Sequence, residues 1–165
     1  MRPRIVFLPG LLCDAEVFAA QMAALAPVAE IAVADFTGCG SIEAMARSAL
    51  ARFDGPISLV GFSLGGRAAR EAVRIAPQRV ERLVLMDTGA GPARDGEAAG
   101  RMELVELARR DGMRALAARW LPPMVHADRE ADPTLIGPIT AMVERMDAAI
   151  FERQIRALLG RPDAR

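Results

Sequence analysis

The sequence has no lysine, no asparagine and no tyrosine, and it has only one histidine and two cysteines. Its 21 strongly basic side chains are therefore all arginines, and they balance 21 Asp and Glu residues. Zero formal net charge gives the chain no overall field that would favour nucleic acid or an anionic membrane surface. Two cysteines, Cys13 and Cys39, are too few for a disulfide framework, and one histidine leaves an ordinary zinc site short of ligands. We therefore expect no metal and no cofactor.

The residues that are present describe a globular chain. Hydrophobic residues make up 52% and charged residues 25% of 165 positions, which excludes disorder and fits one domain. No run reaches the ~18 to 20 apolar residues of a membrane helix. The opening "MRPRIVFLPGLLC" mimics a short signal peptide, but the bulky Leu12 precedes Cys13 where a small residue is expected. We expect a cytoplasmic protein with neither nucleic acid nor a membrane as partner.

Four short apolar runs, at residues 5–8, 31–34, 57–60 and 83–86, indicate β-strands. None alternates between apolar and polar residues, which is typical of parallel strands buried on both faces. Helices are predicted between them, from Asp14 to Leu25, from Ser41 to Phe53 and from Leu64 to Ala76. This alternation predicts an α/β fold with a parallel sheet of about four strands, right-handed crossovers and helices on both faces.

The second part of the chain has a different character, because residues 97–159 contain helical patterns and no further strand. The helices are interrupted at "LPPMVHADREADP", and Asp132 followed by Pro133 is a good start for the next helix. The arginines of the tail are interspersed with acids, which predicts solvated positions for them. We predict an α/β core over residues 1–93 and a helical cap or lid over residues 94–165.

The motif with the clearest chemical meaning is Gly61-Phe62-Ser63-Leu64-Gly65, a G-x-S-x-G pattern between a predicted strand and a predicted helix. In this setting the serine occupies a sharp turn that presents its hydroxyl at the edge of the sheet. Small residues two positions before and after Ser63 relieve the crowding in that turn. Ser63 is therefore a candidate nucleophile, and the alternative is a glycine-rich turn with an incidental serine.

A second candidate element, "LPGLLCD" at residues 8–14, follows the first strand. Acyl transfer requires two N–H groups that stabilise a developing oxyanion, one of them from the residue after the nucleophile. Both loops follow parallel strands, so the backbone N–H groups of Leu11 and Leu64 are the candidate pair. The alternative is an ordinary strand-to-helix loop that needs its glycine for the turn.

The segments "IVFLPGLLCDAEVF", "ISLVGFSLGG" and "RLVLMDTGAG" resemble the α/β-hydrolase fold superfamily, near its small bacterial esterases and enol-lactonases. The resemblance implies that Ser63 is the nucleophile and that Leu11 and Leu64 supply the oxyanion hole. It also implies an acid and a histidine, on two strands that follow the cap. No residue of this chain corresponds to those positions, so the resemblance covers only the N-terminal two thirds of the family's pattern.

Two residues of the chain occur in the family's order of serine, acid and histidine. Asp87 directly follows the fourth predicted strand, a place where some members carry the acid, and the alternative is that its side chain caps the "DTG" turn. His126 is the only histidine, but it lies in the interruption of the helical part. A solvated or cavity-lining role for His126 is the alternative to that of general base, which must reach the serine hydroxyl.

These features predict a serine hydrolase that acts on small carboxylic esters or lactones, with its usual histidine and acid outside this chain. A truncated or catalytically silent binding module is an alternative, since a serine without a base is a poor nucleophile at neutral pH. An acyltransferase or perhydrolase with the same serine turn is another. In a truncated chain, the fourth strand would have a free edge, through which copies of the chain could associate.

Overall fold

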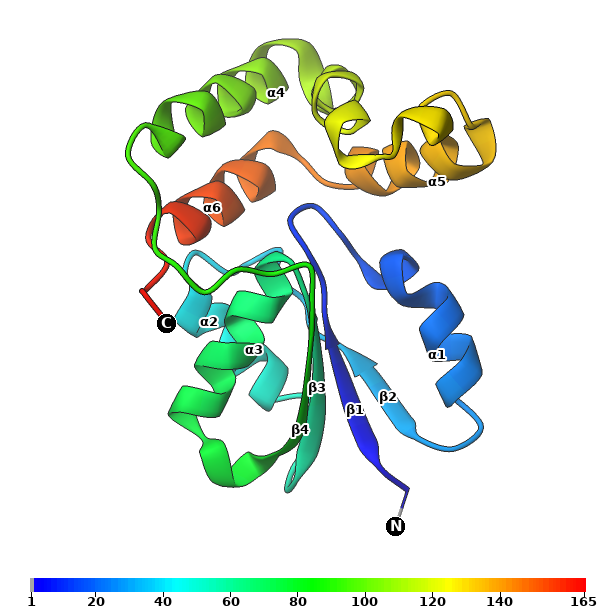
Figure 1. The fold of residues 1–165 in the computed structure, drawn as a ribbon, viewed down its shortest axis with the longest axis vertical. Helices are drawn as coiled ribbons and strands as arrows, with labels where there is room; N and C mark the ends of the chain where they lie inside the picture. The colour runs from blue at the N-terminus through cyan, green and yellow to red at the C-terminus, as the bar shows by residue number, and fades with distance from the viewer. Residues whose placement is uncertain (1) are drawn as a thin grey trace.

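A four-stranded parallel sheet lies at the centre of residues 2–165, the part of the chain that the computed structural model describes (Figure 1). Its spatial order is β2-β1-β3-β4. The strands are β1 (Arg4–Leu8), β2 (Glu30–Val33), β3 (Ile57–Phe62) and β4 (Val80–Met86). Each predicted apolar run therefore lies in or overlaps a strand, and the predicted parallel α/β sheet is confirmed.

Strand β4 departs from the prediction in two respects. It begins at Val80 instead of Leu83, so that it includes the charged residues Glu81 and Arg82. It also pairs only with β3 and lies at the edge, where Leu83, Val84 and Leu85 are 39%, 48% and 42% exposed. The expectation of burial on both faces is therefore wrong for β4, because residues 2–165 place neither a strand beside it nor complete helical cover over it.

Helices cover both faces of the sheet, as predicted. Figure 1 shows α1 (Ala19–Leu25) on one side and α2 (Ile42–Leu50) with α3 (Leu64–Ile75) on the other. A short 3-10 helix, η1 (Ala15–Phe18), precedes α1, and another, η2 (Pro77–Arg79), leads into β4. Asp14 caps η1 and Ser41 caps α2, since Asp14 accepts a hydrogen bond from the N–H of Glu16 and Ser41 Oγ accepts one from the N–H of Ala44.

The second part of the chain is helical and lies beyond the carboxyl ends of the strands (Figure 1). It contains α4 (Glu97–Trp120), η3 (Pro122–Met124), η4 (Ala127–Arg129), α5 (Pro133–Glu144) and α6 (Ala148–Leu159). Gly112 interrupts the helical backbone of α4 with a φ of 87°, and Asp132 caps α5 through the N–H of Thr134. In residues 2–165 no helix has the length and apolar character needed to cross a membrane.

One hydrophobic core joins the sheet to the helical part. Leu8 of β1 and Leu64 at the start of α3 are buried in the same cluster as Phe151 and Ile155 of α6. Full burial of a large apolar side chain stabilises a fold by about 1.5 to 3 kcal/mol. The helices therefore rest on the carboxyl edge of the sheet through a continuous apolar contact, and this contact fixes the surroundings of Ser63.

Candidate active site

Ser63 occupies a strained turn between β3 and α3. Its backbone has a φ of 51° and a ψ of −112°, a region that non-glycine residues rarely adopt and that costs about 1 to 3 kcal/mol. The N–H of Ser63 donates to the carbonyl of Met86 at 2.9 Å, and its carbonyl accepts from Thr88 Oγ1 at 2.7 Å. The end of β4 therefore holds the turn, and the serine side chain is left half-buried at the edge of the sheet.

The glycines on either side of Ser63 are required by close backbone contacts. A Cβ on Gly61 would lie 2.6 Å from the carbonyl oxygen of Gly65, and a Cβ on Gly65 would lie 2.0 Å from the carbonyl oxygen of Leu8. Real Cβ atoms do not approach oxygen so closely, so a side chain at either position would push α3 away from β1 or from its own strand. The predicted relief of crowding around the serine is confirmed for both glycines.

The loop after β1 is fixed from a distance by a buried glutamine. Leu12 has a φ of 57°, and its N–H donates to Gln154 Oε1 of α6 at 2.9 Å. Gln154 is only 1% exposed. Within the loop, the N–H of Cys13 donates to the carbonyl of Gly10 at 3.1 Å, which closes a turn around Leu11 and Leu12. Gln154 is a site residue that the sequence analysis missed, although a glutamine on the apolar face of an amphipathic helix was the available signal.

The backbone N–H groups of the two candidate oxyanion donors are not engaged elsewhere in residues 2–165. Neither the N–H of Leu11 nor that of Leu64 donates to a backbone or side-chain acceptor within that range. Leu64 is the first residue of α3, where backbone N–H groups are free and the helix dipole favours negative charge. Both leucines line the same cavity as Ser63.

This cavity measures about 310 Å³ and lies between the sheet edge and the helical part. Its walls are mainly apolar and include Trp120, Met124, Ile139 and Met142. Apolar walls around a few polar groups are typical of a site for a small organic molecule. We define it as the acyl cavity.

A smaller, polar hollow of about 150 Å³ adjoins Ser63 on the side of β4. Arg67, Arg101 and Arg161 line it together with Asp87 and Thr88. Ser63, Leu64, Arg101 and Leu158 line both spaces, so the hollow and the acyl cavity meet at the serine.

Asp87 lies beside the serine, in the hollow, at the carboxyl end of β4. It has a φ of 44° and is exposed, and no group in residues 2–165 donates a hydrogen bond to its carboxylate. The side-chain cap of the "DTG" turn, the alternative considered from the sequence, is therefore not formed. Leu12, Ser63 and Asp87 are the non-glycine residues of positive φ in residues 2–165, and all three follow strands of the sheet at its carboxyl edge.

His126 has a different environment. Its side chain is 78% exposed, and its Nδ1 accepts from the backbone N–H of Asp128 at 3.4 Å, so that the ring caps η4. It lines neither the acyl cavity nor the polar hollow. The structure thus brings Ser63, Leu11, Leu64 and Asp87 to one edge, and it leaves His126 on an exposed loop.

One of the arginines that line the hollow, Arg161, is buried and forms an ion pair with the partly buried Glu97. Arg161 is 8% exposed and donates from both terminal nitrogens to Glu97, at 3.0 and 2.6 Å. It also donates to the carbonyls of Gly91, Pro92 and Leu158. These bonds from Arg161 hold the pKa of the Glu97 carboxyl well below its usual range, against the opposing effect of burial. The expected solvated position is therefore wrong for Arg161, since Glu97 and the three carbonyls satisfy the buried guanidinium.

Cys13 lines the acyl cavity, and burial raises the pKa of its thiol to about 12. The thiol is therefore protonated at neutral pH and is a poor nucleophile there. Among the described residues 2–165, no three side chains of His, Cys, Asp or Glu come together in a way that could hold a metal ion. The polar groups that Ser63, Leu11 and Leu64 can present to this cavity are a serine hydroxyl and two free N–H groups.

A parallel sheet with a strained serine between its third strand and a glycine-rich helix start is the architecture of the α/β hydrolases. The model of the alpha/beta hydrolase family matches residues 5–164, and the chain belongs to this family. None of the curated proteins matches the sequence significantly.

Solved structures agree with this assignment. A thermophilic esterase from Thermogutta terrifontis is 24% identical, with a TM-score of 0.83 over 98% of this chain and 65% of that one. The enol-lactonase from Burkholderia xenovorans LB400 is also 24% identical, with a TM-score of 0.86 over 99% of this chain and 67% of that one. MenH from S. aureus is 18% identical, with a TM-score of 0.80 over 98% of this chain and 68% of that one. At these identities the likeness establishes the fold, and the chain spans about two thirds of the length of these proteins.

Proposed function

We propose that this chain carries the nucleophile and the oxyanion hole of a serine hydrolase for small carboxylic esters or lactones. One observation carries the proposal: the strained Ser63 shares a largely apolar cavity with Leu11 and Leu64, whose N–H groups are free. Two of the similar structures are an esterase and an enol-lactonase, which agrees with substrates of this class.

The reaction follows from the positions of these groups. Ser63 Oγ attacks the carbonyl carbon of the substrate and loses its proton to a general base, and the carbonyl oxygen becomes an oxyanion. The N–H groups of Leu11 and Leu64 stabilise this oxyanion, and the mainly apolar walls of the cavity strengthen these hydrogen bonds. The intermediate expels the alcohol, which takes up the proton, and leaves an ester on Ser63. Water then cleaves that ester by the same steps and releases the acid.

For the general base, we propose a histidine outside residues 1–165. The general base must lie within about 3 Å of the serine hydroxyl in the reacting complex. His126 lines neither space around Ser63, so it is the weaker of the two assignments. Asp87, which lines the hollow beside Ser63, is the acid that this chain itself could contribute.

We also propose that residues 94–165 act as a cap over a core formed by residues 1–93. The support is the cavity itself, since Trp120, Met124 and Met142 of the helical part face Leu11 and Ser63 of the core across it. A cap of this kind would set the size and shape of the acyl group that the site accepts.

Labelling with a fluorophosphonate tests the nucleophile. In a protein that includes the general base, we expect the probe to modify Ser63, as located by mass spectrometry, and to leave Ser63→Ala unmodified. Ser48→Ala is the matched control, since Ser48 donates to the carbonyl of Asp35 and does not line the acyl cavity. Equal labelling of Ser63→Ala and the wild-type chain would remove Ser63 from the mechanism. His126→Ala should label at an unchanged rate, and a loss of labelling would restore His126 as the base.

A catalytically silent binding module is the second candidate. It is favoured by one observation, that Ser63 Oγ forms no hydrogen bond with a base anywhere in residues 2–165. This candidate predicts that the 165-residue chain hydrolyses 4-nitrophenyl acetate no faster than Ser63→Ala, while an uncleavable amide analogue still binds in the acyl cavity. Turnover that depends on Ser63 would exclude it.

A further inference from the structure

Positive charge gathers beside the candidate nucleophile. Three arginines line the polar hollow: Arg67 from α3, Arg101 from α4 and Arg161 from the segment after α6. The one carboxylate that lines it is Asp87. Even with the neighbouring Glu97 included, the three arginines leave an excess of positive charge next to Ser63.

Arg161 does not contribute a free donor to the hollow. Its bonds to Glu97 and to three backbone carbonyls, described above, engage all three guanidinium nitrogens. Its role is to hold Glu97 and the loop after β4 in place, and its charge is largely balanced by Glu97.

Arg67 and Arg101 are only partly engaged. Arg101 donates from Nε to Glu97 at 2.7 Å, and neither of its terminal nitrogens donates to an acceptor in residues 2–165. Arg67 donates from Nη1 to the carbonyl of Gly91 at 2.8 Å, and no carboxylate of the described residues lies within 4.0 Å of it. The single negative charge of Glu97 is thus shared by Arg101 and Arg161, and Arg67 has no carboxylate partner among residues 2–165.

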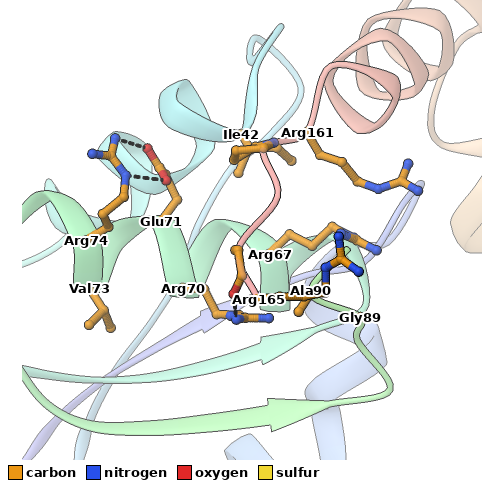
Figure 2. A pocket seen from close by; sticks show the side chains of 12 residues that line it. Ile42, Arg67, Arg70, Glu71, Val73, Arg74, Gly89, Ala90, Arg161 and Arg165 are labelled. Atoms are coloured by element: carbon orange, nitrogen blue, oxygen red, sulfur yellow. Dashed lines mark hydrogen bonds and ion pairs between the residues drawn. The ribbon is translucent and has the colours of Figure 1, made fainter. Parts of the chain in front are cut away.

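The pKa of Arg67 also reflects the lack of a carboxylate partner. Burial and the neighbouring Arg161 lower the pKa of its guanidinium, Arg70 and Arg101 add to this effect, and Glu97 opposes it. Figure 2 shows that Arg70 and Arg74 lie further along α3, where Glu71 binds Arg74, whereas Arg67 and Arg161 extend toward the end of the sheet at which the strands finish. Arg67 is therefore the arginine of α3 that lines the hollow.

We propose that Arg67 and Arg101 bind a carboxylate on the acyl part of the substrate, so that the site selects anionic esters or lactones over neutral ones. This inference rests on the proposed function for its orientation, with the reacting carbonyl at Ser63 and the carboxylate in the adjoining hollow. A planar guanidinium pairs well with a carboxylate, and charge-assisted hydrogen bonds are the stronger kind. Arg67 and Arg101 act here as specificity-determining residues.

Binding of glutarate to Ser63→Ala tests the anion site without any chemistry at the serine. By calorimetry we expect glutarate to bind and its neutral diamide to bind much more weakly. Arg67→Gln and Arg101→Gln should each weaken glutarate about tenfold, the effect expected for losing one charge-assisted contact. Arg67→Lys and Arg101→Lys should restore part of the affinity, since they keep the charge. Arg110→Gln, whose parent side chain is 72% exposed and bound to Asp111, is the matched control on α4 and should change nothing.

The same variants separate this inference from the proposed function. In a protein that turns over esters, 4-nitrophenyl hemiglutarate should exceed 4-nitrophenyl pentanoate in kcat/KM, and added salt should reduce the difference. Equal kcat/KM for both esters would overturn the carboxylate assignment and leave the hydrolase intact. Hydrolysis of neither ester, with glutarate still bound through Arg67 and Arg101, would overturn the hydrolase and leave the anion site. Glutarate binding that is absent, or that ignores both Gln variants, would refute the anion site itself.

Discussion

Gln154 of α6 accepts a hydrogen bond from the backbone N–H of Leu12, 2.9 Å away, although 142 positions separate the two residues. This bond ties the helical part of the chain to the loop that presents the N–H of Leu11 beside Ser63. Leu12 is fully buried and Gln154 is only 1% exposed, so the amide oxygen of Gln154 is the acceptor that satisfies this N–H. The position of one oxyanion donor therefore depends on a residue of the last helix.

Gln154→Leu is expected to lower stability and to impair the site. An unsatisfied buried N–H costs about 1 to 3 kcal/mol, which chemical denaturation would measure as a lower free energy of unfolding. Labelling of Ser63 by a fluorophosphonate should slow as well, because the loop around Leu11 loses its anchor. Gln21→Leu on the exposed surface of α1 is the control, and an equal effect of both changes would argue against a specific anchor.

Gly65→Ala is expected to be among the most damaging single substitutions. Its Cβ would lie 2.0 Å from the carbonyl oxygen of Leu8, so α3 must move away from β1, and overpacking of this kind costs about 1 to 3 kcal/mol or more. Gly100→Ala is the matched control in α4, where a Cβ meets nothing within 4 Å. The control should be neutral or stabilising by up to about 1 kcal/mol, in line with helix propensity. Thermal unfolding of the two variants would show whether they diverge in this way.

The ion pair between Glu97 and Arg161 should make the free energy of unfolding depend on pH in the acidic range. Because the folded-state pKa of Glu97 lies below its ordinary value near 4.5, the pair stabilises the fold fully above that value. The contribution is lost as the pH falls from about 5 toward the folded pKa. Glu97→Gln should cost about 2 kcal/mol at neutral pH and flatten the decline of unfolding free energy below pH 5. Glu103→Gln, an exposed position of the same helix, should keep the wild-type profile; a profile unchanged by Glu97→Gln would contradict the role of the pair.

The free edge of β4 is expected to support self-association of the 165-residue chain. Three consecutive apolar residues, Leu83, Val84 and Leu85, are exposed on this strand. The outer backbone N–H and C=O groups of an edge strand can also pair with a second copy of the chain. Light scattering should show a mass that rises with concentration, and Val84→Lys should shift it toward the monomer. Val28→Lys is the control, since Val28 is 61% exposed but lies far from this edge. A strictly monomeric wild-type chain would contradict the prediction.

The elements and the serine turn could be predicted from the sequence because their causes are local. Unbroken apolar runs mark strands buried between helices, and Gly61 and Gly65 mark the crowded turn around Ser63. The start of β4 was missed for a local reason too, since an edge strand tolerates the charges of Glu81 and Arg82. An apolar pattern finds only the part of such a strand that resembles a buried one.

The contacts that complete the site could not be predicted, because they join residues far apart in the chain. The pattern around Gln154 does not say that its amide meets the N–H of Leu12, and an arginine in a charged tail gives no sign that Arg161 is buried. The excess of positive charge beside Ser63 arises only when α3, α4 and the tail meet. The sequence predicts the nucleophile, and the three-dimensional arrangement predicts the substrate's charge.

The hydrogen bonds from Ser63 to Met86 and from Thr88 to Ser63 also have a dynamic consequence. They attach the strained backbone of Ser63 to β4, the strand whose residues are the most exposed in the sheet. Local opening of an exposed edge strand requires less free energy than global unfolding. Fraying of β4 would therefore release the serine turn while the rest of the sheet stays closed, and any strand that docks on β4 would slow hydrogen exchange at Ser63 itself.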